Sequence, residues 1–146
     1  MVFSKELDRT KEVTGKLLKN DTKTMYKTHI KRILDFMENS IKIFEEKKVR
    51  VHWEETEEKW YFSVVDVVEI LTDSVNPRDY WFKMKQRVSL EDGIELSTIC
   101  RQLKLISSDG KRYNTDCADV QALFRIIQAI PSPKAEPFKQ WLAKVG

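Results

Sequence analysis

The sequence predicts an α+β domain, in which small antiparallel strands and hairpins pack with several short helices, preceded by a helical N-terminal extension. Some segments alternate apolar and polar residues, the two-residue period of half-buried strands, and others repeat apolar residues at the spacing of amphipathic helices. With 146 residues, of which 41% are apolar and 34% charged, the chain has enough apolar residues for a core and is too apolar to be disordered throughout.

Residues 1–36 are predicted to form a separate basic unit. Met25, Ile30 and Leu34 lie at helical spacing, opposite a face rich in lysine. We hypothesise that the helix over residues 22–36 mediates formation of a homodimer.

The next segments have the pattern of a hairpin or small meander. Strand-type residues resume at Trp60-Tyr61-Phe62 after a charged turn over residues 54–58. The alternating apolar residues before that turn are Ile41, Ile43, Val49, Val51 and Trp53.

Two helices are expected to follow. Ser63 is a natural N-cap for a helix whose apolar stripe lies within residues 64–71. Asp66 follows Ser63 by three residues, which is close to the capping-box pattern. Asn76-Pro77 is a strong start for the second helix, which Gly93 ends.

The C-terminal third predicts a second hairpin and two further helices. Leu103 and Leu105, with Ile99 as a weaker candidate, indicate strands that turn through Ser108-Asp109-Gly110-Lys111. Thr115 or Asp116 is expected to cap the next helix. The final helix follows Pro131-Ser132-Pro133, and its inward residues are Phe138, Trp141 and Leu142.

Several functional classes are disfavoured. No apolar run approaches the roughly 18 residues of a membrane span, and the first ten residues are too polar for a secretory signal. Cys100 and Cys117 are too few for a four-ligand zinc site and are expected to be small core residues. No glycine-rich phosphate loop or nucleophile motif is present, and the glutamates of residues 54–58 have the pattern of a solvated turn. We therefore expect a cytoplasmic, non-enzymatic protein without metal or other cofactor.

The net charge of +3 conceals a division along the chain. Residues 1–36 carry nine Lys or Arg and five Asp or Glu, residues 37–74 carry five and ten, and residues 75–146 carry twelve and eight. Such segregation can produce a basic face, which attracts polyanions, although ordinary solvated surfaces explain it as well.

The basic residues of the last segment, with two amides, are the candidate contacts to double-stranded DNA. Lys and Arg neutralise backbone phosphates, β-ribbons enter grooves, and Gln and Asn can read base edges. A lysine-rich solvent face and local turn bonds are the competing interpretations. The candidates are Arg78, Lys83, Lys85, Arg87, Gln102, Lys104, Lys111, Arg112 and Asn114.

From Met37 onward the chain resembles the Bro-N domain of prophage antirepressor-like proteins. The motifs that carry the resemblance are Lys59–Leu71 (KWYFSVVDVVEIL), Asn76–Trp81 (NPRDYW), Ser107–Lys111 (SSDGK) and Ile130–Gly146 (IPSPKAEPFKQWLAKVG). The resemblance implies a phage DNA-binding module that regulates transcription, and the matching motifs are largely structural.

The resemblance also divides the chain. It predicts a Bro-N-like DNA-binding domain over residues 37–146 and leaves residues 1–36 as an extension: an upstream start, a partner-binding helix or an expression artefact. Family members commonly continue into a variable second domain, so the chain is either a short member or the N-terminal module alone.

An alternative function is capture of a phage repressor protein without any contact to DNA. Antirepressors can act in this way, and the acidic residues 54–58 would suit a basic partner surface.

Overall fold

The computed structural model describes residues 30–31 and 40–146. Ile30 and Lys31 are helical, and the rest of the expected basic unit lies outside the described residues, as does most of the segment expected to form a dimer. The remaining elements, in chain order, are β1 (Ile41–Phe44), β2 (Lys47–Glu54), β3 (Lys59–Ser63), α3 (Val64–Thr72), α4 (Pro77–Asp92), a 3-10 turn (Leu96–Ile99), β4 (Arg101–Ile106), β5 (Arg112–Ala118), α5 (Val120–Gln128) and α6 (Ala135–Val145). The predicted α+β class is confirmed.

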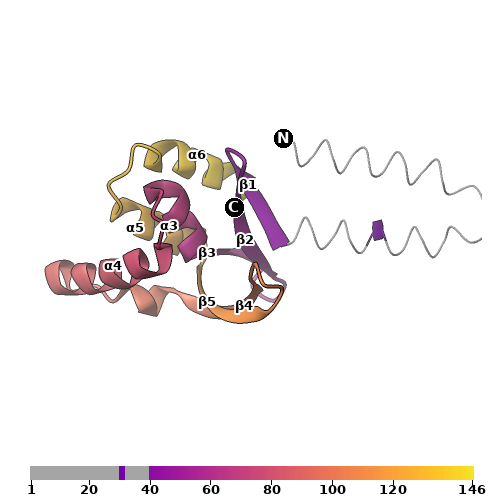
Figure 1. Ribbon diagram of the computed structural model, residues 1–146, viewed down its shortest axis with the longest axis horizontal. Helices are drawn as coiled ribbons and strands as arrows, with labels where there is room; N and C mark the ends of the chain where they lie inside the picture. The colour runs from indigo at the N-terminus through magenta and orange to yellow at the C-terminus, as the bar shows by residue number, and fades with distance from the viewer. Residues whose placement is uncertain (1–29, 32–39) are drawn as a thin grey trace, which may run out of the picture.

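The sheet consists of two antiparallel units that are joined over a short distance. Its strand order is β1-β2-β3-β5-β4. Strands β3 and β5 share only the pairs Phe62↔Ala118 and Ser63↔Cys117, because β3 ends there and the chain turns into α3. The sheet curves strongly, so that the β4–β5 hairpin lies across from β2 (Figure 1).

Helices α3, α5 and α6 cover one face of this sheet (Figure 1). Alternate strand residues such as Val49, Val51 and Phe62 are buried on that face within the main hydrophobic core. A smaller cluster of Tyr61, Leu105 and Cys117 lies apart from it. The two clusters leave the outer faces of β4, β5 and α4 available to solvent.

Helix α4 begins and ends as its sequence predicts. The side chain of Asn76 accepts a hydrogen bond from the backbone amide of Asp79 at 3.2 Å, and Pro77 occupies the first turn. Gly93 ends the helix in the left-handed region, with a φ of 67°. The helix extends away from the body of the protein (Figure 1).

The predicted start of α5 is wrong by several residues. Strand β5 continues through Ala118, and Asp119 caps the helix by accepting a hydrogen bond from the amide of Ala122 at 2.9 Å. Thr115 is a buried strand residue opposite Leu103, so it is unavailable as a cap.

Two further local expectations are corrected. Ser63 stands at the N-cap of α3 but makes no capping bond, and Asp66 completes no capping box, because both side chains bind Arg50 instead. Ile99, a weaker strand candidate, lies in the 3-10 turn.

Candidate nucleic-acid interface

The β4–β5 hairpin presents a polar outer face made of alternate residues from both strands. Lys104 lies opposite Asn114, and Ile106 lies opposite Arg112, so these four side chains share one face of the ribbon. All four are exposed. A two-stranded ribbon with this composition has the shape and chemistry of an element that enters a DNA groove.

The turn of this hairpin is held by its own residues. Asp109 accepts a hydrogen bond from the amide of Lys111 at 2.8 Å and another from the hydroxyl of Tyr113 at 2.5 Å. Gly110 adopts a φ of 83°, which a side chain would disfavour. The tip is therefore fixed in shape, and it carries Lys111 exposed.

Asp116 attaches α4 to this hairpin. Its carboxylate accepts hydrogen bonds from the indole of Trp81 at 2.8 Å, the ammonium of Lys85 at 3.3 Å and the amide of Gln102 at 3.2 Å. Burial acts to raise the pKa of Asp116, but the three donors outweigh it and the pKa lies below its ordinary value. The ionised carboxylate thus fixes the helix beside β5.

This attachment sorts the candidate residues of α4 into two groups. Lys85 faces Asp116, and Arg78 lies seven residues, about two helical turns, before Lys85 on the same face of α4, so both belong to the flank beside the hairpin. Lys83 and Arg87 instead line a hollow beside the α3–α4 loop, and Arg87 donates to the backbone carbonyl of Ala129 at 2.8 Å.

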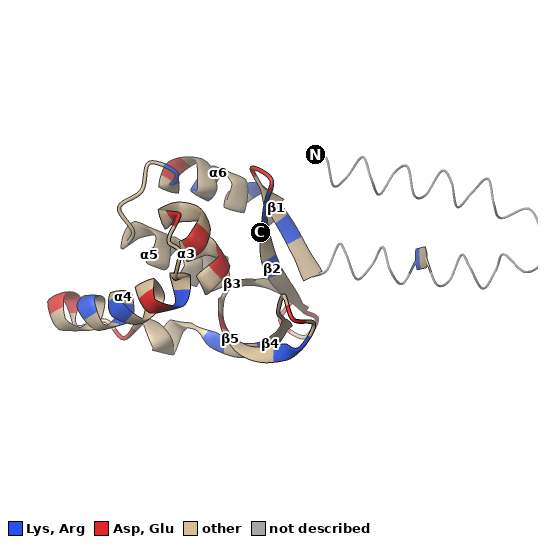
Figure 2. Ribbon diagram, in the orientation of Figure 1, with Lys and Arg blue, Asp and Glu red and all other residues tan. Residues whose placement is uncertain are grey.

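The candidates also differ in whether their charge is already engaged. Lys83 pairs with Asp79 at 3.0 Å, and Lys85 pairs with Asp116. Figure 2 shows Lys and Arg along α4 with Asp and Glu interspersed among them. Among the residues that the structure describes, the candidate cations that are exposed and whose side chains form neither an ion pair nor a hydrogen bond are Arg78, Lys104, Lys111 and Arg112.

The two amides are likewise unequal. Gln102 donates to Asp116 directly across the β4–β5 pairing, so its amide is engaged, but in a cross-strand bond and not in the local turn bond of the competing interpretation. Asn114 is exposed and makes no side-chain hydrogen bond within the described part of the chain.

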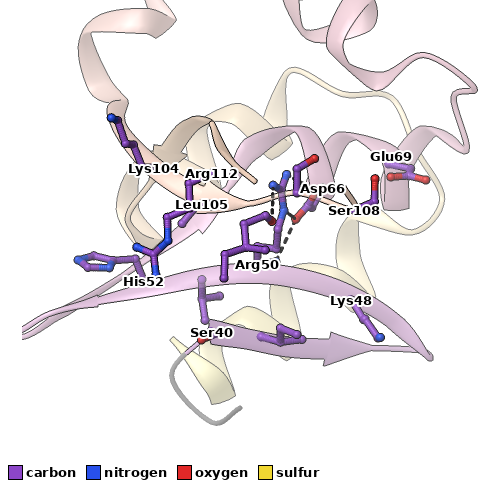
Figure 3. A pocket seen from close by; sticks show the side chains of 14 residues that line it. Ser40, Lys48, Arg50, His52, Asp66, Glu69, Lys104, Leu105, Ser108 and Arg112 are labelled. Atoms are coloured by element: carbon purple, nitrogen blue, oxygen red, sulfur yellow. Dashed lines mark hydrogen bonds and ion pairs between the residues drawn. The ribbon is translucent and has the colours of Figure 1, made fainter. Parts of the chain in front are cut away.

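A groove of about 710 Å³ separates β4 from the β1–β2 hairpin (Figure 3). Arg50 lies at its centre and binds Asp66 through two guanidinium nitrogens, at 2.9 and 3.0 Å. A third nitrogen donates to the carbonyl of Ile106 at 3.2 Å, which connects β2 to β4. The backbone amide of Arg50 also donates to Asp66 at 2.9 Å, one residue before the first β2–β3 pair, Val51↔Phe62.

The groove contains basic residues that the sequence reasoning missed. Lys48, Arg50 and His52 occupy alternate positions of β2 and line the groove together with Lys104 and Arg112 of the hairpin. The signal was available in the sequence, since three basic residues at two-residue spacing on a strand share one face. Their proximity to β4 depends on the curvature of the sheet and has no local signal.

The acidic turn between β2 and β3 is exposed, as predicted, but part of its charge is engaged. Glu57 accepts hydrogen bonds from the hydroxyl of Tyr61, at 2.7 Å, and from the guanidinium of Arg101. The hydrogen bond to Glu57 and burial raise the pKa of Tyr61 to about 12. Glu54 bonds Thr56 and lies 3.5 Å from His52.

The two cysteines are sheltered from solvent. Cys117 is buried and Cys100 half-buried against the core, and burial raises the pKa of each thiol to about 12. In the part of the chain described here, no cluster of three His, Cys, Asp or Glu is placed to hold a metal, and no helix has the length and apolar character to cross a bilayer.

Comparison with protein families gives one match. Residues 48–145 match the model of the BRO family, N-terminal domain. The chain belongs to this family. The Bro-N match begins within β2 and includes every residue of the hairpin, the groove-lining part of β2 from Lys48 onward, and α4. Comparisons with curated proteins and with solved structures gave no match.

Proposed function

We propose that this Bro-N chain is the DNA-binding module of a phage antirepressor-like regulator of transcription, and that it acts without catalysis. The observation that carries the proposal is the gathering of unpaired cations at the β4–β5 hairpin and the adjoining start of α4. Arg78, Lys104, Lys111 and Arg112 are exposed, and none is neutralised by a carboxylate in the described structure. Family membership supports the same function.

In this proposal the hairpin enters a groove of duplex DNA with its outer face toward the bases. Lys104, Lys111 and Arg112 would neutralise phosphates on either side of the groove, and Asn114 would meet a base edge, where an amide can bond adenine in two places. Arg78 would reach a phosphate beside the hairpin. Helix α4 would support the ribbon through Asp116 rather than read the sequence itself.

The test is the salt dependence of binding to fluorescent duplexes, some random and some with phage operator sequence, followed by anisotropy. Each phosphate contact contributes about 0.9 to the slope of log affinity against log salt concentration. The double variant Lys104→Gln/Arg112→Gln is therefore expected to lower that slope by about 1.8, and to weaken binding to all sequences.

A matched control keeps the same change in net charge. Arg125 and Lys144 lie on α5 and α6 and are exposed, so Arg125→Gln/Lys144→Gln should leave the slope near that of the unmodified protein. Equal slopes for the two double variants would contradict the assignment of the hairpin.

The rival function, capture of a basic repressor surface by residues 54–58, has weaker support. Glu54 and Glu57 are already engaged by His52, Arg101 and Tyr61, which leaves fewer free carboxylates for a partner. Failure to bind any duplex at low salt would favour this rival.

A further inference from the structure

The groove between β4 and the β1–β2 hairpin has an excess of positive charge. Arg50 and Asp66 neutralise one another at its centre. Of the remaining charged residues along its walls, Lys48, Lys104 and Arg112 are basic and Glu69 alone is acidic. An excess of cations in a concave site with partly apolar walls favours an anionic ligand, because the surrounding protein strengthens the field.

The basic side chains are distributed unevenly along the groove. In Figure 3 the side chain of Arg112 extends from β5 toward His52 on β2, whereas the side chain of Lys104 points the other way and Lys48 lies at the opposite end. Donors from two separate hairpins can therefore converge on one anion. Guanidinium and ammonium groups bind phosphate through charge-assisted hydrogen bonds, and arginine does so with two parallel donors.

The rest of the groove differs in character. Ile41 of β1 and Leu105 and Ile106 of β4 contribute apolar lining from both sides of the groove, and the volume of about 710 Å³ lies within the usual range of small-molecule sites. A ligand with one anionic end and a flat, largely apolar body matches this division. A nucleotide has both parts at a suitable size.

We propose that the groove binds a phosphate group carried by a ligand of nucleotide size. Arg112 and His52 hold the phosphate, for which His52 exchanges its contact with Glu54, 3.5 Å away, and the apolar lining receives the ring. Two sources share this chemistry: a free nucleotide and the terminal nucleotide of a DNA strand that carries a 5′-phosphate.

The groove shares Lys104 and Arg112 with the surface proposed for DNA. A free nucleotide in the groove therefore neutralises Arg112, one of the cations that DNA requires, and it weakens binding of duplex DNA. This consequence rests on the proposed function, whereas binding of the nucleotide itself does not.

Calorimetric titration of the full chain with ADP, and separately with inorganic pyrophosphate, tests the site. Loss of the charge-assisted contacts in Arg112→Gln is expected to weaken ADP binding at least tenfold, about the effect of one hydrogen bond to a charged group. His52→Gln should weaken ADP binding several-fold and leave the affinity for unphosphorylated duplex unchanged. Lys47→Gln is the control, because Lys47 neighbours the groove residue Lys48 but does not line the groove; it should alter neither.

The source is identified by comparing duplexes with and without a 5′-phosphate in the anisotropy assay. If the duplex with the 5′-phosphate binds more tightly than the duplex without it, and His52→Gln removes this gain, the groove binds strand ends. If ADP binds and competes with duplex DNA, the groove binds free nucleotides. The proposal would be overturned if the 5′-phosphate gave no gain in duplex affinity and neither ADP nor pyrophosphate bound at millimolar concentration. It would also be overturned if ADP binding were unchanged in Arg112→Gln and His52→Gln. Binding of ADP without binding of any DNA would sink the proposed function and leave the groove assignment intact.

Discussion

The two hairpins of the sheet use their charged residues in different ways. On the β2–β3 hairpin, Glu57 is bonded to Tyr61 and Arg101, and Arg101 also lies 4.7 Å above the ring of Tyr61. On the β4–β5 hairpin, Lys104, Lys111 and Arg112 are exposed and form no ion pair with any described residue. The acidic turn of the first hairpin is bound to Arg101 at the start of β4 and so helps to hold the two hairpins together, whereas three cations toward the tip of the second hairpin are free for a partner.

This difference shows that the density of charged residues in a sequence is a poor guide to a binding surface. Helix α4 has the highest local count of basic candidates, yet Lys83, Lys85 and Arg87 are each engaged by an acceptor within the fold. A cation that is already paired gains less from a phosphate, because its existing bond must first be exchanged.

Removal of Arg50 should have the largest effect, because it breaks the connection between the two hairpins. Arg50 is half-buried and binds Asp66, Ser63 and the carbonyl of Ile106. Arg50→Ala is expected to lower the free energy of unfolding by about 2–3 kcal/mol, somewhat below the loss for a fully buried ion pair. Urea denaturation measures the change.

The control for this variant is Lys59→Ala, which breaks the ion pair between Lys59 and Asp119, at 3.4 Å, whose lysine side chain is 50% exposed. The expected loss of unfolding free energy is below about 1 kcal/mol. Similar losses in both variants would mean that Arg50 does not connect the hairpins.

Glu57→Ala should remove the hydrogen bonds by which the β2–β3 hairpin engages Tyr61 and Arg101. The hydrogen bond to Glu57 is the largest cause of the raised pKa of Tyr61, so this pKa should fall from about 12 toward the ordinary tyrosine value. Because folding raises this pKa, the stability it contributes is complete below about pH 10 and is lost as pH rises toward 12. Tyrosinate absorbance, with Tyr61→Phe to identify the residue, should show one tyrosine that titrates late in the parent and earlier in the variant.

Asp116→Asn should have a smaller effect, since it turns one paired cation into a free one. The variant keeps an acceptor for Trp81 and releases Lys85, so the salt slope of DNA binding should steepen by up to about 0.9. Asp79→Asn releases Lys83 on the other flank of α4 and should leave the slope unchanged. An equal change in both variants would show that the flanks of α4 are equivalent.

Local features of the fold were predictable because local residues determine them. The strands β1 and β2, the cap at Asn76 and the Asp-Gly turn all follow from patterns within a few residues. The start of α5 was misplaced because Asp116 bonds Trp81, which lies 35 residues away in the sequence. Asp66 was misread as part of a cap for a similar reason, since its partner Arg50 lies on strand β2, 16 residues away in the sequence.

The candidate site was predictable as a set of residue types but not as a surface. The sequence analysis predicts Arg78, Lys83, Lys104 and Arg112 alike as DNA contacts. No pattern in the sequence distinguishes the cations that are paired in the fold from those that are free. The separation depends on which acceptors the fold brings near each side chain. The groove was missed because its two walls are about 50 residues apart in the chain and meet only through the curvature of the sheet.

The most direct test compares two triple variants of equal charge. Lys104→Gln/Lys111→Gln/Arg112→Gln removes the free cations of the hairpin, and Lys83→Gln/Lys85→Gln/Arg87→Gln removes the engaged cations of α4. The measurement is the salt slope of duplex binding for each. We expect the hairpin variant to lower the slope by about 2.7 and the helix variant to lower it by less than about 0.9. A larger loss in the helix variant would contradict the claim that the unpaired hairpin cations bind DNA.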